Sequence, residues 1–288
     1  CYGIEKYGTE EQKQKYLTPL ASGQKLGAFC LSEPEAGSDA TSQRTTAIDM
    51  GDHYLLNGTK NWITNGGSAS TYIVIAQTNV EKGHKGINAI IVEKDMPGFV
   101  VGAKEDKLGI RGSDTHTLMF TDVKVPKENR LGEDGFGFKF AVKTLSGGRI
   151  GIASQALGIA SGAYELALQY SKERKTFGKP IIANQVVQHH LVEMMTEVAA
   201  VKALTHEACS AYIRGEDVTI LASMAKLKIG KLVRTIPSDC LQYWGGAGYM
   251  ADSIVGRAYR DTRVVAIGGG ADEIMCGIIA KLKGLNPR

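Results

Sequence analysis

The chain of 288 residues is long enough to form two domains, and its 43% hydrophobic and 22% charged residues are usual for a globular protein. The net charge of +4 is spread along the sequence apart from a basic run at 172–179, which argues against nucleic-acid binding. The five cysteines are scattered without CxxC spacing, and no apolar run reaches the length of a membrane span. We therefore expect reduced thiols, no metal site and no membrane span.

The first 131 residues predict one short helix followed by β-structure. Thr9 and Gln12 have the spacing of a capping box, so residues 10–20 should be helical, with Ser22-Gly23 ending the helix. From residue 25 to 131, short runs rich in Val, Ile, Tyr and Thr are separated by turn signals such as Met50-Gly51-Asp52 and Asn57-Gly58. The predicted strands are 45–49, 54–56, 72–77, 88–93, 99–104 and 118–125. We interpret this region as a small antiparallel sandwich or barrel, and the lack of βαβ alternation argues against a Rossmann fold.

After Gly135 the hydrophobic period becomes helical. One helix should begin there, and a second should end near Gly215 with this inward stripe: Val187, Leu191, Met194, Val198, Val201, Thr205, Ala208 and Tyr212. A third should run over 218–244, with Ile220, Met224 and Leu227 on one face and an interruption at Pro237. A last helix is expected over 272–283, and the pattern favours an antiparallel four-helix bundle.

Two polar loops follow predicted strands. Residues 31–39 (LSEPEAGSD) combine a serine, glutamates, a proline and a glycine, so their backbone N–H groups suit an anion. Residues 62–67 (WITNGG) add an aromatic plane and a hydroxyl group. Taken singly, a loop like the first is usually only a turn, and a strand tryptophan such as Trp62 is more often a core residue than a cofactor platform.

Together with 174–180 (RKTFGKP), 242–246 (QYWGG) and 260–261 (RD), these loops resemble the signature segments of the acyl-CoA dehydrogenases, in the same order and over nearly the whole chain. Further segments at 104–111, 123–129 and 147–158 are most similar to the short-chain, butyryl-type branch. The resemblance implies an α+β multidomain fold, with an antiparallel β-sandwich or barrel followed by an antiparallel four-helix bundle. It also implies three parts: the end of a mostly missing N-terminal helical domain (1–24), a middle β-domain (25–131) and a C-terminal helical domain (132–288).

The resemblance implies FAD as the cofactor. The implied contacts are Phe29, Leu31, Ser32, Gly37, Ser38, Trp62 and Thr64, followed by Arg174, Thr176, Phe177, Gln242 and Gly246. Ser32 and Thr64 would bind the isoalloxazine edge, and Trp62 would pack against the ring. The later residues would bind the FAD of a neighbouring subunit, with Arg174 at its pyrophosphate. The alternative for 172–179 is a solvated basic helix end.

The implied reaction is removal of a proton from Cα and a hydride from Cβ of a short- to medium-chain acyl-CoA, which gives a trans-2-enoyl-CoA. Ser38 and Arg149 match positions near the CoA nucleotide, and the N–H of Gly269 would bind the thioester oxygen. In the family a glutamate usually takes the proton, but Gly269 stands at that position. Gly148 stands at the position used by the long-chain and isovaleryl types, so both usual base positions are glycine.

Three explanations of the glycines remain open. In the first, a base comes from elsewhere, with Glu273 and Asp272 the nearest acids. In the second, the chain is a low-activity or inactive paralogue, a complex subunit that binds FAD and a CoA ester, or an engineered form without its base. In the third, the same scaffold carries out different chemistry. The resemblance also implies electron-transferring flavoprotein as a partner, a homotetramer and a role in fatty-acid β-oxidation. It implies a bacterial cytoplasmic or mitochondrial matrix location, between which the sequence does not discriminate.

Overall fold

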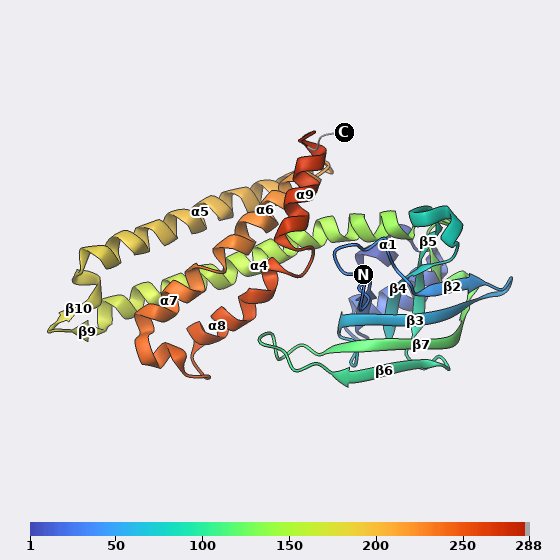
Figure 1. The fold of residues 1–288 in the computed structure, drawn as a ribbon, viewed down its shortest axis with the longest axis horizontal. Helices are drawn as coiled ribbons and strands as arrows, with labels where there is room; N and C mark the ends of the chain where they lie inside the picture. The colour runs from blue at the N-terminus through green and yellow to red at the C-terminus, as the bar shows by residue number, and fades with distance from the viewer. Residues whose placement is uncertain (286–288) are drawn as a thin grey trace. The chain divides into compact units, whose positions relative to one another are not determined.

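The computed structural model describes residues 1–285 and divides into two compact units (Figure 1). Unit 1 comprises Cys1–Lys107 and Arg111–Thr144, and unit 2 comprises Leu108–Ile110 and Leu145–Arg288. Unit 1 contains the sheet and unit 2 the helices, so the α+β multidomain fold class is confirmed.

Unit 1 begins with short helices: α1 (Tyr2–Tyr7), α2 (Glu10–Gln12), the π-helical turn η1 (Lys13–Leu17) and α3 (Thr18–Ala21). The predicted capping box is present, because the Thr9 N–H donates to Gln12 Oε1 at 3.0 Å and the Gln12 N–H donates to Thr9 Oγ1 at 3.2 Å. Gln12 Nε2 also donates to the carbonyls of Glu128 and Arg130, at 2.6 and 2.9 Å. One side chain therefore caps a helix and ties it to a segment more than a hundred residues away.

The sheet of unit 1 has the strand order β6-β7-β3-β2-β4-β5-β8, with β1 paired to β4. The strands are β1 (Gly27–Cys30), β2 (Thr46–Asp49), β3 (His53–Thr64), β4 (Thr71–Gln77), β5 (Ile87–Glu93), β6 (Phe99–Lys104), β7 (Thr115–Pro126) and β8 (Arg130–Leu131). Most pairs are antiparallel, as expected, but β1–β4 and β2–β4 are parallel. Turn signals mark hairpins between successive strands, whereas these parallel pairs join strands that are distant in sequence, so local patterns do not reveal them.

The sequence predicted a turn between strands at Asn57-Gly58, and this prediction is wrong. Both residues lie inside the long strand β3, where the register with β7 shifts between Leu56 and Gly58. Gly58 has φ +141°, and a Cβ there would lie 2.6 Å from Thr45 Oγ1. The glycine therefore forms a bulge against a close neighbour, which is the other common use of glycine in a strand.

The sheet carries apolar side chains on both faces. Along β4, Tyr72 and Val74 belong to one buried cluster, while Ile75 and the half-buried Ile73 belong to another. The second cluster includes Ile4 and Tyr16 from the N-terminal helices, together with Phe140. Because both faces of β4 are covered, this strand is a continuous apolar run rather than an alternating one.

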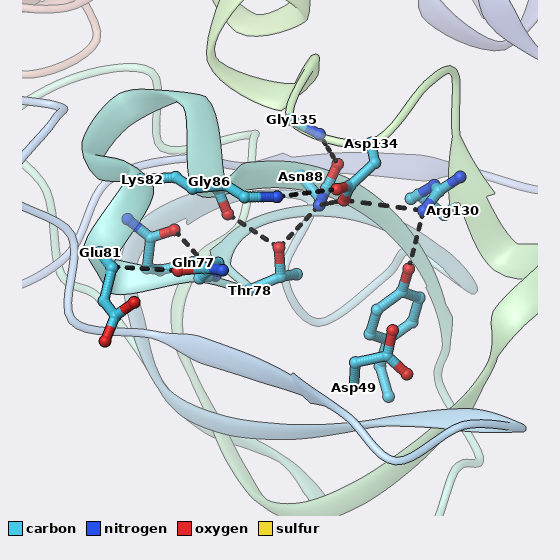
Figure 2. A network of polar contacts seen from close by, with 12 residues as sticks. Asp49, Gln77, Thr78, Glu81, Lys82, Gly86, Asn88, Arg130, Asp134 and Gly135 are labelled. Atoms are coloured by element: carbon cyan, nitrogen blue, oxygen red, sulfur yellow. Dashed lines mark hydrogen bonds and ion pairs between the residues drawn. The ribbon is translucent and has the colours of Figure 1, made fainter.

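A polar network fixes the loop after β4, which forms the 3₁₀ segment η2 (Val80–Gly86) (Figure 2). Asn88 Nδ2 donates to Thr78 Oγ1 and Asp134 Oδ1, each at 2.8 Å, and its Oδ1 accepts the Gly135 N–H at 2.9 Å. Gln77 Nε2 donates to the Gly83 carbonyl at 2.9 Å. The loop is therefore held from β4, from β5 and from the segment after β8.

Unit 2 is helical (Figure 1). Its elements are α4 (Gly137–Glu173, of which unit 2 takes the part from Leu145), β9 (Lys175–Thr176), β10 (Lys179–Pro180), η4 (Ile181–Ala183), α5 (Gln185–Ile213), α6 (Thr219–Leu232), α7 (Ile236–Trp244), η5 (Gly245–Tyr249), α8 (Ile254–Thr262), η6 (Arg263–Ala266) and α9 (Asp272–Leu282). The predicted interruption is confirmed, because α6 ends before Pro237 and the proline lies in the first turn of α7. The stripe predicted for α5 is inward-facing except for Tyr212, which is exposed.

The face of α6 that carries Ile220, Met224 and Leu227 is not the buried face of the helix. Ile220 and Leu227 are half-buried and Met224 is exposed. The buried positions of α6 combine small and larger side chains: Ala222, Ser223, Ala225, Lys226, Ile229, Gly230 and Leu232.

Candidate flavin and acyl-CoA site

In unit 1, the loop 31–39 follows β1 and lies beside β3. The N–H of Asn61 donates to the carbonyl of Ser32 at 2.8 Å, so Ser32 is brought next to Trp62. Of the other predicted contacts here, Phe29 and Leu31 are half-buried against the core, while Gly37 and Ser38 are exposed. The half-buried Ser32 and the exposed Trp62 therefore lie on neighbouring parts of the backbone of unit 1.

Trp62 faces solvent because β3 contains a second bulge. Buried positions along the strand are even-numbered up to Lys60, but the register with β7 shifts before Ile63, which is buried. Trp62 has φ +60° and is 61% exposed, so it is not a core residue. A bulky side chain in the left-handed region is strained, and such strain concentrates at functional sites. Thr64, two residues further along, is also exposed.

A buried ion pair lies behind the loop 31–39. Lys60 Nζ lies 2.8 Å from Glu33 Oε1 and also donates to the Leu31 carbonyl and to Gln43 Oε1, at 3.0 and 2.9 Å. Glu33 also accepts the N–H groups of Arg44 and Thr45. Burial would raise the pKa of Glu33, but Lys60 and these donors outweigh it and hold the pKa below its ordinary value.

The turn after Thr64 is held in place rather than flexible. Asp114 accepts the N–H groups of Gly67 and Ser68, at 2.8 and 3.2 Å. A Cβ on Gly67 would lie 2.6 Å from His116 Nε2, so a larger residue does not fit there without a shift. The carboxylate and the histidine therefore fix the strand end that carries Thr64.

A hollow of about 570 Å³ lies in unit 1 between the chain segment 41–46, the end of β4 and η2. It is lined by Thr41, Gln43, Arg44, Thr46, Gln77, Val80, Gly83 and His84. Arg44 pairs with Glu35 at 2.6 Å, and η2 is held on the other side by the network of Figure 2. The hollow is thus continuous in sequence with the loop 31–39 and has a polar lining with two basic side chains.

In unit 2, three predicted contacts belong to the two-stranded hairpin β9–β10 or directly precede it. Arg174 comes just before β9, Thr176 ends β9 and Phe177 lies in the turn, and all three are exposed. Phe177 and Gly178 at its tip have φ of +51° and +79°, the backbone of a tight two-residue turn. The Phe177 side chain is fully exposed (104%). Exposure of a large apolar side chain to water is unfavourable, and exposed apolar surface is typical of interaction sites.

Gln242 and Gly246 are exposed at the end of α7 and in η5. Tyr170, near the end of α4, stacks on Trp244 with ring centroids 4.5 Å apart. This contact brings the Gln242–Gly246 segment near the β9–β10 hairpin. Figure 1 shows the hairpin at the end of unit 2 away from α9.

The predicted base position lies in an open glycine loop before α9. Gly269 is exposed with φ +68°, and a Cβ at Gly269 or Gly148 would have no neighbour within 4 Å. The Gly269 carbonyl accepts a hydrogen bond from Arg149 Nε at 3.3 Å. Arg149 is buried, its Nη1 has no partner, and burial lowers the pKa of its guanidinium.

Neither acid at the start of α9 is placed as an obvious substitute for the missing glutamate. Asp272 is buried and pairs with Lys226 at 3.3 Å and Arg234 at 3.1 Å. Glu273, the other candidate substitute, is exposed on the first turn of α9. Burial lowers the pKa of Lys226, and Asp272 opposes that change.

The signature Arg260-Asp261 has a structural contact within unit 2. Asp261 Oδ1 accepts the N–H of Ile110 at 2.7 Å, and a Cβ on Gly109 would lie 2.5 Å from the Arg260 carbonyl. The pair therefore holds the short segment Leu108–Ile110 against α8.

Comparisons with family models, with known proteins and with solved structures identify the family. The family model for the acyl-CoA dehydrogenase middle domain matches residues 28–123, and that for the C-terminal domain matches residues 135–283. The chain belongs to the acyl-CoA dehydrogenase family. Acyl-CoA dehydrogenases are FAD-binding flavoproteins, and the exposed Trp62 plane beside Ser32 fits a planar aromatic cofactor.

Individual acyl-CoA dehydrogenases are similar over nearly the whole chain. An acyl-CoA dehydrogenase of Bacillus subtilis is 49% identical over 275 residues, which is 96% of this chain and 73% of the relative. The short-chain-specific enzyme of Clostridium acetobutylicum is 45% identical over 277 residues, with the same coverage. The structure of butyryl-CoA dehydrogenase from Megasphaera elsdenii matches with a TM-score of 0.95 at 44% identity, over 98% of this chain and 74% of that one. The resemblance to the short-chain branch is confirmed.

Sequence reasoning missed two buried lysines, Lys60 behind the loop 31–39 in unit 1 and Lys226 beside the glycine loop in unit 2. Lys60 occupies an inward position in the alternation of β3, and Lys226 lies on the small-residue face of α6. A charged residue at a position whose period faces inward is the signal that could have identified both. Among residues 1–285, no cluster of His, Cys, Asp and Glu could hold a metal ion, and no helix is long and apolar enough to cross a membrane.

Proposed function

We propose that this chain is an FAD-dependent acyl-CoA dehydrogenase-type oxidoreductase that acts on a short- to medium-chain acyl-CoA. The observation that carries the proposal is the exposed Trp62, turned outward by a bulge, beside the Ser32 loop. The comparisons support the family, and the short-chain relatives support the substrate range.

The residues of unit 1 would hold the flavin end of FAD. Trp62 would pack against the ring, the hydroxyls of Ser32 and Thr64 would bind its polar edge, and Phe29, Leu31, Gly37 and Ser38 would complete the contact. When bound, FAD supplies the acceptor for the hydride that leaves Cβ. Arg174, Thr176, Phe177, Gln242 and Gly246 would bind the FAD of a neighbouring protomer, in a homotetramer, which is supported by the fully exposed Phe177.

The CoA nucleotide would occupy the hollow between the segment 41–46, the end of β4 and η2. Its basic lining residues Arg44 and His84 suit the phosphates, and Ser38 lies three residues before the first lining residue. Arg149 remains the second expected contact of this part of the substrate, although its orphaned Nη1 and its bond to Gly269 also suit a role at the thioester.

The chain's own residues would bind the thioester but supply no strong base. The N–H of Gly269 would donate to the thioester oxygen and stabilise the charge that develops as Cα loses its proton. General-base assistance is typically worth about 10²- to 10⁴-fold in rate, and neither Gly148 nor Gly269 can provide it. Glu273 is the only substitute we retain, because it is exposed and near the loop.

The second candidate is an FAD- and CoA-ester-binding paralogue or complex subunit with little dehydrogenase turnover. The two open glycine positions favour it, because binding residues are present where base residues are absent. In either case we propose electron-transferring flavoprotein as the electron acceptor or partner. We also retain 1–24, 25–131 and 132–288 as the proposed domains.

The test is an anaerobic visible spectrum of the FAD-loaded protein before and after addition of butyryl-CoA. Rapid bleaching of the flavin band in the unaltered protein would support the dehydrogenase with a base elsewhere, whereas a shift without bleaching would support the binding paralogue. A colourless protein that takes up no FAD would refute both. Gly269→Glu should raise the bleaching rate by about 10²- to 10⁴-fold if a base is all that is missing. Gly269→Gln is the matched control, since it has the same size and backbone strain but no carboxylate.

A further inference from the structure

Two successive carbonyls of the glycine loop each accept a hydrogen bond from a buried cation in unit 2. Arg149 Nε donates to the Gly269 carbonyl at 3.3 Å, and Lys226 Nζ donates to the Gly270 carbonyl at 2.5 Å. Lys226 is fully buried (0% exposed). The loop itself is at the surface, where water could satisfy these carbonyls, so the use of two buried cations fixes the direction in which they point.

Lys226 is itself held by a carboxylate. Asp272 Oδ1 lies 3.3 Å from Lys226 Nζ, and Asp272 Oδ2 lies 3.1 Å from Arg234 Nη2. Gly230, on the same face of α6, leaves the space that the Asp272 carboxylate occupies. The groups around the loop are therefore Arg149 from α4, Lys226 from α6 and Asp272 from α9, with Glu273 exposed nearby. Arg234, in the turn between α6 and α7, contacts Asp272.

Fixed carbonyls imply fixed N–H groups, because each peptide unit is planar. The Gly269 carbonyl, held by Arg149, shares its plane with the Gly270 N–H, and the Gly270 carbonyl, held by Lys226, shares its plane with the Ala271 N–H. Within residues 1–285, the N–H groups of Gly269, Gly270 and Ala271 donate to no backbone carbonyl. The loop thus presents unused donors, and the two buried cations orient the peptides that carry the N–H groups of Gly270 and Ala271.

We propose that Lys226, held by Asp272, is a positioning residue that orients the Gly270–Ala271 peptide at the end of the glycine loop for stabilisation of an enolate-like thioester oxygen. The inference rests on the proposed function. In the step concerned, the Cα–H bond breaks, its electron pair moves onto the thioester oxygen and the proton leaves to solvent or to a base. With no glutamate at Gly269, such stabilisation is the main help that this loop can give to the step.

The test uses acetoacetyl-CoA and the FAD-loaded protein. The Cα proton of this thioester is acidic and its enolate absorbs in the ultraviolet, so its ionisation is read by pH titration without turnover. Lys226→Met should raise the pKa of the bound probe by about one unit, a tenfold fall in its ionisation constant. Asp272→Asn should act in the same direction, and Lys226→Arg should restore part of the effect because it keeps a donor and a charge. Lys228→Met is the control, since Lys228 lies on the same helix but pairs with Glu197 at the surface.

An unchanged probe pKa in a Lys226→Met protein that still binds acetoacetyl-CoA would overturn the proposal, and so would an equal rise in the Lys228→Met control. Failure of the unaltered protein to bind acetoacetyl-CoA at all would instead refute the proposed function, and this inference with it. If Lys226→Met does not fold, Arg234→Ala provides the same test, because Arg234 is half-exposed and supports Asp272 from outside. It should give a smaller rise in the same direction, and no rise in both Arg234→Ala and Asp272→Asn would reject the proposal.

Discussion

Lys60 Nζ lies 2.8 Å from Glu33 Oε1, and the two side chains are 0% and 5% exposed. Through the same ammonium group, Lys60 holds the Leu31 carbonyl, directly before Ser32. A buried charge pair therefore fixes the loop that we propose to bind the flavin edge.

Removing one partner of this pair should destabilise unit 1 strongly. Lys60→Met leaves the Glu33 carboxylate buried without its cation, and such losses cost about 3–5 kcal/mol. Urea denaturation should show this change, whereas Lys124→Met, on the exposed side of β7, should change stability by less than about 0.5 kcal/mol. The double variant Lys60→Met/Glu33→Leu should recover most of the loss, and a double variant as unstable as the single one would contradict this account.

The same pair predicts a loss of stability in acid. The pKa of Glu33 is lower in the folded state than its ordinary value of 4.5, so its contribution is complete above that value and is lost as pH falls towards the folded pKa. Urea midpoints measured from about pH 6 to about pH 3.5 should fall more steeply in the unaltered protein than in Glu33→Gln. Glu35→Gln, in the same loop but exposed, should retain the steep fall.

Neighbouring residues of β3 should separate stability from cofactor binding. Ile63→Ala removes a buried side chain and should cost about 2–5 kcal/mol. Trp62→Ala removes a mostly exposed one in a strained backbone, and should cost far less in the FAD-free protein. FAD titration followed by fluorescence should show the larger loss of affinity for Trp62→Ala. Equal losses of stability and affinity in both variants would argue against Trp62 as a flavin platform.

Phe177 should matter only in the assembly. Because its ring is fully exposed in the protomer, Phe177→Ala should leave protomer stability within about 0.5 kcal/mol of the unaltered value. Light scattering after gel filtration should detect weaker oligomers, and the eluted protein should retain less FAD. Ile213→Ala, an exposed apolar residue at the end of α5, is the control. An unaltered oligomer that keeps its FAD would contradict the proposed contact with a neighbouring protomer.

Local patterns predicted the elements but not the long-range arrangement. The capping box at Thr9, most of the strands and the break at Pro237 depend on neighbouring residues and were predicted from the sequence, whereas β3 runs on through the predicted turn at Asn57-Gly58. The outward turn of Trp62 depends on a bulge between β3 and β7, which no single segment reveals. The burial of Lys60 and Lys226 was not predicted for a related reason, since each is paired with an acid that is distant in sequence. The family signatures supplied the proposed site residues, and the buried charges behind two of the proposed segments required the structure.

The hydrogen bonds of Gln12 also constrain the order of events during synthesis. Gln12 donates to the carbonyl of Arg130, 118 residues later in the chain. At roughly 5–20 residues per second, a ribosome needs about 6–24 s to make the partner after it has made the helix. Throughout that interval the apolar face of the N-terminal helices that carries Ile4 and Tyr16 lacks the later part of its cover, Phe140 included. The nascent chain should therefore be most exposed to chaperones and proteases before its β-domain closes.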